Sequence, residues 1–388
     1  MRGVAPPRLR AAQAGISLVE TLVALVLGLA MVSVAFNLYV SNSAVFRQIE
    51  AMVRLQESAS IAATLLETSI RHAGGTLCRN NLPMTPLLKT SSPYWEYEVG
   101  KGLLGLRGYE SSVNDPIVRS LRIAGDSISV VNHNSGALAR VADFGTPTVD
   151  TNGLSGIYRF EITGTDLAVG DIALACDYAR AVLFQISTKN NSRITLRAGT
   201  QALTPTPSPG NCGVFMKRAS AAGQGIRALD GPYSCAGDKT LYSTGEMYKF
   251  GPGTMIVEHS FEHWYIGRKT NTTNGLSLFR VRMGNDASGN VKLLDAEEVV
   301  QDVTDMQITY LPGLLSTGYP ASSDYETATQ INARSNYTFR SVTAVRIVLT
   351  LTSPEAVGLA ANNAASAATY TIPINVAIRA RMPGVVRR

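Results

Sequence analysis

The sequence predicts an α+β fold: a long N-terminal helix, membrane-spanning in its first half, packed on a large antiparallel β-sheet body. Three observations support this prediction. Residues 21–46 carry no charge, and about 20 apolar residues suffice to cross a bilayer. No proline then occurs before Pro83, so one helix can continue unbroken to Arg71. Short β-branched and aromatic segments between turn residues follow to the C-terminus, which is typical of strands.

The first half of this helix contains one charge that a plain membrane anchor would not need. Glu20 is the only ionisable side chain between Gly15 and Arg47. A carboxylate within a membrane span costs on the order of 2.5–3.5 kcal/mol. Residues 1–15 hold three arginines, no acid and no apolar run, and their small residues precede the span, whereas a signal peptide is cleaved after it. We therefore expect the Glu20 carboxylate to pair with a positively charged group.

This N-terminus, with Glu20 as the fifth residue after Gly15, resembles a type IV prepilin leader. The resemblance implies that a prepilin peptidase cleaves between Gly15 and Ile16 and that the new amine of Ile16 is methylated. It also implies that Glu20 meets the freed amine of a neighbouring subunit and sets the register of a filament. Ile16 stands where Phe is usual, and Ala14 where Lys or Arg is usual. A plain signal anchor with a chance glutamate is the alternative.

The second half of the helix is amphipathic. The pairs Glu50–Arg54 and Glu67–Arg71 are spaced i,i+4 in the favourable orientation, and Gly74 and Gly75 supply a stop. Apolar residues recur at spacings near 3.6: Val45, Ile49, Met52, Ala59, Ala62, Leu66 and Ile70. Strands are expected at residues 127–132, 156–163, 173–176, 181–187, 193–198, 255–266, 276–283, 291–294, 303–310, 342–350 and 369–378. Whether they form one sheet or two stays open.

The body resembles the PilW family of minor pilins. The segments that carry the resemblance are residues 70–78, which close the helix, 170–187 around a cysteine, 278–282 with 299–310, 342–351 and 372–381. The resemblance implies three parts: a leader peptide (1–15), a transmembrane and amphipathic pilin helix (16–72) and a periplasmic β-rich body (73–388).

Four cysteines in a chain exported beyond the inner membrane point to disulfides. From the residues alone, three pairings are open. A metal site is the alternative, but no Cys-x-x-Cys spacing occurs. The family resemblance implies that Cys78 pairs with Cys176, stapling the helix end to the sheet, and that Cys212 pairs with Cys235.

The resemblance further implies a protein without catalytic activity or cofactor. It would join a tip or priming complex with other minor pilins (of the FimU, PilV, PilX and PilE kinds), the major pilin and a PilY-type adhesin, and support pilus assembly, twitching motility and adhesion. The subunit would wait in the inner membrane, body in the periplasm, before reaching the pilus tip. A J-like minor pseudopilin of type II secretion is the first alternative. A membrane-anchored periplasmic enzyme or binding domain is the second.

Composition agrees with these expectations. Loss of the leader, with its three arginines, lowers the net charge from +6 to +3, which is too little and too scattered to predict nucleic-acid binding. The mature chain keeps 373 of the 388 residues. A body of this bulk fits a filament tip better than a closely packed shaft.

One catalytic pattern is present and is set aside. Residues 259–263 match the His-x-x-Glu-His pattern of inverted zinc proteases, which needs both histidines on one helical face. The alternation around them instead places His259 and His263 on one side of a strand, and we expect that strand to be exposed at the surface. His72 and His133 are isolated in the sequence. Residues 285–290 suggest a hairpin turn rather than a calcium loop, because the closing glutamate of such a loop is missing. No metal site is expected.

Overall fold

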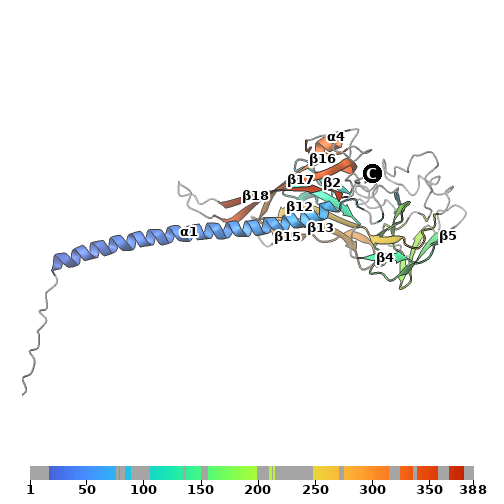
Figure 1. Ribbon diagram of the computed structural model, residues 1–388, viewed down its shortest axis with the longest axis horizontal. Coiled ribbons are helices and arrows are strands. Elements are labelled where there is room, and N and C mark those ends of the chain that lie inside the picture. Colours follow the sequence, from blue (N-terminus) through green and yellow to red (C-terminus); the bar gives the residue numbers. More distant parts are fainter. Residues whose placement is uncertain are drawn as a thin grey trace, which may run out of the picture. The chain divides into compact units, whose positions relative to one another are not determined.

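The computed structural model describes residues 17–75, 78, 84–88, 105–133, 137–149, 156–198, 209–211, 213–214, 248–270, 275–313, 324–334, 339–356 and 367–379. The chain divides into two compact units, Met1–Arg54 with Glu355–Ala368, and Leu55–Pro354 with Thr369–Arg388. The first unit contains the N-terminal part of α1 (Leu18–Arg71), the long blue helix of Figure 1. The predicted helix is confirmed, beginning two residues later than expected.

The predicted β body is also confirmed, and the described strands form three sheets rather than one or two. The largest has nine strands, in the order β1 (Met84–Pro86), β8 (Ala181–Gln185), β7 (Ile172–Cys176), β11 (Met255–Glu258), β4 (Leu138–Val141), β6 (Gly156–Thr163), β10 (Arg193–Ala198) and β9 (Thr188–Asn190), with β5 (Thr146–Val149) paired to β6. Its strand pairs are antiparallel, apart from the parallel pair β1–β8.

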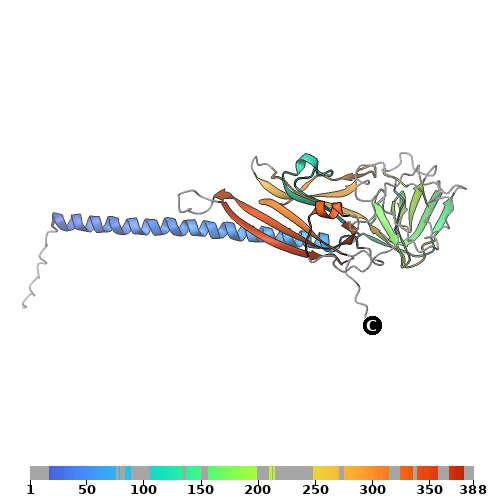
Figure 2. The same ribbon diagram turned by 90° about the horizontal axis from the view of Figure 1, so that it is seen from above.

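The second sheet has six described strands and the third has three. The six-stranded order is β14 (Val291–Leu293), β13 (Leu276–Asn285), β12 (Ser260–Arg268), β3 (Ala124–Asn132) and β2 (Leu106–Tyr109), with β15 (Glu297–Gln301) paired to β13. The third sheet is β16 (Val303–Pro312), β17 (Val342–Ala356) and β18 (Ala367–Ala377), the orange and red strands of Figure 2. Short helical elements are α4 (Ala328–Ala333), η1 (Arg119–Leu121) and η3 (Phe339–Ser341).

Alternation of apolar and polar residues explains the nine-stranded sheet. In β6, Tyr158, Phe160 and Ile162 are buried, and the residues between them are half-buried, as the two-residue period of a strand requires. Phe160 packs against Phe184, with ring centroids 5.3 Å apart, and against Phe250, at 5.9 Å. β7 and β8 are buried along their whole length, which marks them as central strands covered on both faces.

The C-terminal part of α1 packs on the body through a narrow stripe. Its buried residues are Leu55, Ala59, Ala62, Leu66, Ser69 and Ile70. This stripe confirms the predicted positions from Ala59 onward. Val45 and Ile49, which are 50% and 55% exposed, belong to the unit that holds the N-terminal half of α1.

The strand expected at residues 255–266 is two strands in two sheets. β11 ends at Glu258 in the nine-stranded sheet, and β12 begins at Ser260 in the six-stranded sheet. His259 stands between them, and its backbone N–H donates to the carbonyl of Ile172 in β7. The chain changes sheets at this residue, which alternation alone does not reveal because the period of two continues through it.

Candidate functional site

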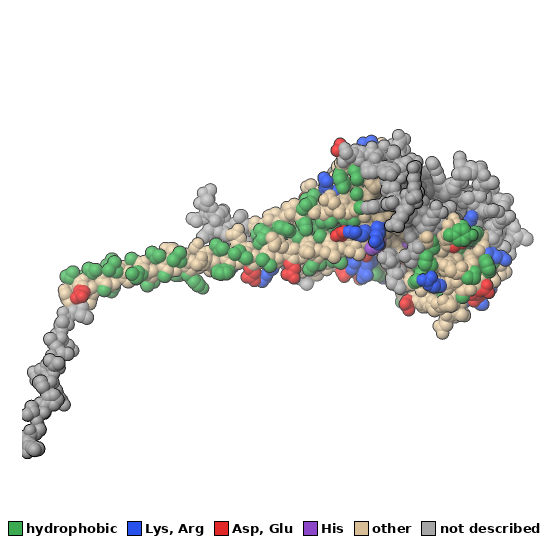
Figure 3. Space-filling view, in the orientation of Figure 1, with side chains coloured by type: hydrophobic (Ala, Val, Ile, Leu, Met, Phe, Trp, Pro, Cys, Tyr) green, Lys and Arg blue, Asp and Glu red, His purple; other side chains and the backbone are tan. Residues whose placement is uncertain are grey.

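The first candidate is the exposed apolar surface of α1. The side chains of residues 18–42 are all exposed in the single chain, and their most apolar window has a mean hydropathy of 2.3 with none of it buried. Figure 3 shows this surface as the green covering along the helix. Apolar surface left in water costs about 25 cal/mol per Å², so lipid or other protein must cover it. The helix fits a single-pass membrane anchor in length and composition.

Glu20 lies in the first turn of α1. The unsatisfied N–H groups of a helix N-terminus favour a negative charge there, so the helix itself stabilises this carboxylate in part. Gly15 and Ile16 lie outside the described residues. The geometry therefore places the carboxylate at the start of the apolar helix, with its side chain open to a partner.

At the opposite end of α1, a polar contact within the body holds the helix to β12. Ser69 Oγ donates to Glu262 Oε2 at 2.7 Å and accepts from Trp264 Nε1 at 3.4 Å. The guanidinium of Arg280 lies 3.6 Å from Glu262 and 5.4 Å from the centre of the Trp264 ring. A small serine thus lets the helix approach the sheet closely while it pairs with both Glu262 and Trp264.

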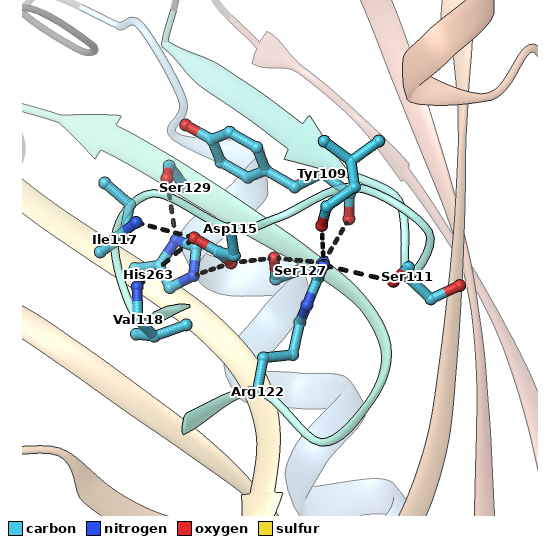
Figure 4. A network of polar contacts seen from close by, with 10 residues as sticks. Tyr109, Ser111, Asp115, Ile117, Val118, Arg122, Ser127, Ser129 and His263 are labelled. Carbon is cyan, nitrogen blue, oxygen red and sulfur yellow. Dashed lines mark hydrogen bonds and ion pairs between the residues drawn. The ribbon is translucent and has the colours of Figure 1, made fainter. Parts of the chain in front are cut away.

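The second candidate is a buried network centred on Asp115, drawn in Figure 4. Asp115 Oδ2 accepts from His263 Nε2 at 2.9 Å and from the hydroxyl of Ser127. Its Oδ1 accepts the backbone N–H of Ile117 at 2.9 Å and of Val118 at 3.4 Å. Burial raises the pKa of Asp115, but the hydrogen bond and charge of His263, with the bonds from Ser127 and Ile117, outweigh it and hold this pKa at about 2. The carboxylate is therefore ionised at neutral pH.

Arg122 ties the loop that carries Asp115 to the sheet. Its guanidinium donates to the carbonyls of Tyr109 at 3.0 Å and Ser111 at 3.5 Å, to the carbonyl of Val113, and to Ser127 Oγ at 3.1 Å. Figure 4 shows these bonds converging on one end of the side chain. Ser127 links the hydrogen bonds of Arg122 to those of Asp115, because its hydroxyl accepts from Arg122 and donates to Asp115.

Ser129 completes a serine–histidine–aspartate arrangement, since its Oγ lies 2.9 Å from His263 Nδ1. In acyl transfer, such a serine must reach a substrate carbonyl. Here Ser129 and His263 are 0% exposed and Asp115 is 1% exposed. A surface hollow of about 280 Å³ lies nearby, lined by Tyr109, Asn114, Pro116 and residues of α4, but neither Ser129 nor His263 reaches it. This geometry joins the 110–118 loop to the sheet.

The expectation that the two histidines of residues 259–263 lie on an exposed strand was wrong. His259 is 2% exposed and His263 0%. They do share one side of the chain with Phe261 and Tyr265, and the rings of His263 and Tyr265 are 6.1 Å apart, but a second layer covers that side. The 110–118 loop covers His263, and His133 covers His259, with 2.9 Å between His259 Nδ1 and His133 Nε2. His133 is thus not isolated in space.

Two of the four cysteines lie in the part of the chain that the structure describes. Cys78 is bonded to Cys176, with 6.0 Å between their Cα atoms, so the chain just past α1 is stapled to β7 as the resemblance implied. Cys212 and Cys235 lie outside the described residues. Within the part of the chain that the structure describes, no cluster of three or more His, Cys, Asp or Glu side chains is placed to hold a metal ion.

Sequence reasoning missed Asp115, Ser127 and Ser129. A signal was present: two serines spaced i,i+2 put polar groups on one face of a strand whose other face carries Ile128 and Val130. Such a pattern in a strand interior indicates buried hydrogen-bonding partners. The identity of those partners was not in the pattern, because Asp115 and His263 are 148 residues apart.

Comparison with known protein families gives a match for the C-terminal third of the chain. Residues 263–383 match the model of a family described as Type IV Pilus-assembly protein W. No curated protein and no solved structure matches the chain. The matched residues contain β13–β18 and most of β12, including Trp264, which contacts α1, whereas every strand of the nine-stranded sheet lies before them. The match makes this C-terminal part of the chain similar to a type IV pilus-assembly family.

Proposed function

We propose that this chain is a PilW-like minor pilin that acts without catalysis. The observation that carries the proposal is the exposed apolar half of α1, which begins with the single carboxylate of Glu20, in a chain whose residues 263–383 match a pilus-assembly family. In the inner membrane, lipid covers this surface. In a filament, the helices of neighbouring subunits cover it instead, and the body remains outside the helix bundle.

Assembly requires the leader to be removed. A prepilin peptidase cleaves between Gly15 and Ile16, and the methylated amine of Ile16 becomes the partner of Glu20 on the next subunit. Losing one member of a buried charge pair costs roughly 3–5 kcal/mol, so the pairing discriminates strongly against an axial shift by one residue. The bulky body suits the tip, in a priming complex with other minor pilins that presents a PilY-type adhesin and supports twitching and adhesion.

The decisive experiment replaces Glu20. Glu20→Ala should leave the protein in the membrane but abolish its recovery with sheared surface pili and reduce piliation, because the partner amine is left unpaired. The matched control is Glu50→Ala, which removes a carboxylate that is 63% exposed and paired with Arg54 on the same helix. If Glu20→Ala enters the pilus fraction as the wild type does, the proposal fails.

Two further measurements separate the alternatives. Mass spectrometry of the mature N-terminus should find methylated Ile16, and an intact N-terminus that still carries Arg2 and Arg8 would exclude prepilin processing. If deletion of the gene abolishes secretion of a type II substrate and leaves piliation normal, the chain is a pseudopilin of the J kind instead.

A further inference from the structure

The buried pair His133 and His259 lies where three parts of the body meet. His133 follows β3 of the six-stranded sheet, and His259 is the residue at which the chain passes from the nine-stranded to the six-stranded sheet. His133 Nδ1 lies 3.0 Å from the carbonyl oxygen of Gly75, just past the end of α1. The two rings are tilted at 52°, with centroids 4.9 Å apart, and both side chains are buried.

The contacts determine which ring nitrogens carry protons. A backbone carbonyl can only accept, so His133 Nδ1 must be the protonated nitrogen. Neutral His133 then has a lone pair at Nε2, and the nitrogen facing it, His259 Nδ1, must donate. The result is a one-way chain of hydrogen bonds from His259 to His133 to Gly75, in which both rings are neutral.

Among the described residues, no carboxylate is recorded in contact with either ring to compensate an added proton. On His133 Nε2, it would set two N–H groups against each other 2.9 Å apart. The groups that face the pair are the Gly75 carbonyl from the end of α1 and, from β7, the Ile172 carbonyl bonded to the His259 amide. Glu258 precedes His259 and so points to the other side of the chain. In contrast, His263 meets the carboxylate of Asp115.

The pKa directions agree with this geometry. Burial lowers the pKa of His133 to about 4, although its bond to Gly75 acts in the opposite direction. Burial, and secondly the neighbouring His133, hold the pKa of His259 well below its ordinary value.

We propose that His133 and His259 form an acid-sensitive latch that holds the end of α1 to both sheets and opens locally when both rings take up protons. Above a pH of about 6.5, the ordinary histidine pKa, both rings are neutral whether the latch is closed or open. Below it, the open form binds two protons and the closed form none. The ratio of open to closed latch therefore rises as the pH falls, by about tenfold per unit near pH 6.5 and by close to a hundredfold per unit near pH 5, until the closed form itself begins to titrate near a pH of about 4.

Amide hydrogen exchange on the full chain in detergent micelles tests this slope between pH 6.5 and pH 5. Protection of the His259 and Gly74 amides, corrected for intrinsic exchange, should fall with a logarithmic slope per pH unit that grows from about one at pH 6.5 to about two at pH 5. The amides of β6 and β10 should show no such slope. A slope of one or less at the latch at pH 5, or the same slope in β6 and β10, overturns the proposal.

Substituting His259 tests whether each histidine of the pair contributes one of the two protons. In His259→Asn, the side-chain amide replaces Nδ1–H as donor to His133 and cannot titrate, so the slope at pH 5 should fall from about two to about one. His72→Asn removes a half-buried histidine near the end of α1, outside the pair, and should leave the slope at two. An unchanged slope in His259→Asn overturns the proposal.

Nitrogen NMR of the unsubstituted protein gives an independent test that needs no variant to fold. The chain has four histidines in all, so selective labelling yields few signals. Two of them should show the Nδ1–H tautomer and remain neutral down to pH 5. If either ring of the pair shows the Nε2–H tautomer, or titrates near pH 6.5, the latch does not exist as proposed.

Discussion

The buried carboxylate of Asp115 allows a quantitative prediction about the body's stability. Asp115→Ala removes the acceptor of four donors: His263 Nε2–H, the Ser127 hydroxyl and the backbone N–H groups of Ile117 and Val118. Each buried donor left unpaired costs about 1–3 kcal/mol, and the lost acceptor is a charged group, whose hydrogen bonds are stronger than neutral ones. The Ser127 hydroxyl can rotate and the Val118 bond is long, so we expect a loss of about 4 kcal/mol.

The Asp115→Asn substitution removes the negative charge but keeps some of the hydrogen bonds. Its amide oxygen can still accept from Ile117, and its amide nitrogen can donate to His263 once that ring moves its proton to Nδ1, where Ser129 Oγ accepts it. We therefore expect about half the loss of the alanine variant. Asp286→Ala is the control, because Asp286 makes the same kind of loop bonds, to the N–H groups of Ser288 and Asn290 in the β13–β14 turn, at the surface.

Urea unfolding of the detergent-solubilised chain measures these losses, with fluorescence as the probe. Trp264 is fully buried, and the chain has two tryptophans in all. With a denaturant slope of about 3 kcal/mol per M, a 4 kcal/mol loss lowers the midpoint by more than about 1 M. If Asp115→Ala unfolds within about 0.3 M of wild type, or no earlier than Asp286→Ala, the network is not stabilising the body as argued.

The Asp115 carboxylate also makes the stability of the folded body decrease at low pH. Its pKa is lowered from 3.8 to about 2 in the folded chain, so its contribution of roughly 2 kcal/mol is present above pH 4 and is lost as the pH falls to 2. Unfolding midpoints measured from pH 5 to pH 2 should decline more steeply in wild type than in Asp115→Asn. Parallel curves would contradict the assignment.

Two further substitutions test packing and the staple. A Cβ at Gly108 would lie 1.8 Å from Tyr310 Oη, so Gly108→Ala should cost about 1–3 kcal/mol by overpacking. Tyr310→Phe should relieve it in part, since Tyr310 Oη has no hydrogen-bond partner among the described residues; equal urea midpoints for the single and double variants would refute this. Replacing both Cys78 and Cys176 by serine opens a loop with a sequence separation of 98 residues and should cost on the order of 4 kcal/mol. Reduction of the wild type, which also opens any bond between Cys212 and Cys235, should cost at least as much, and an unchanged midpoint in both would refute it.

Local sequence patterns determined the elements of this protein. The unbroken apolar and amphipathic run predicted α1 to its last residue, because a helix requires only its own periodicity and the absence of proline. The bounds of β6 and β10 were predicted as the structure has them, because alternation between turn residues is also a local property. The N-terminal glycine and glutamate pattern, together with the apolar run, was enough to suggest a pilin.

Tertiary structure alone decided how those elements divide into sheets and which polar groups meet. The change of sheet at His259 leaves no mark on the alternation, because both strands keep the same period. His263 meets Asp115 across 148 residues, and His133 meets His259 across 126. Such contacts depend on strand register and on which layer covers a face. The sequence determines both only through the sum of all packing interactions, so the same histidine pattern that suggested an exposed strand became, once covered, part of the interior.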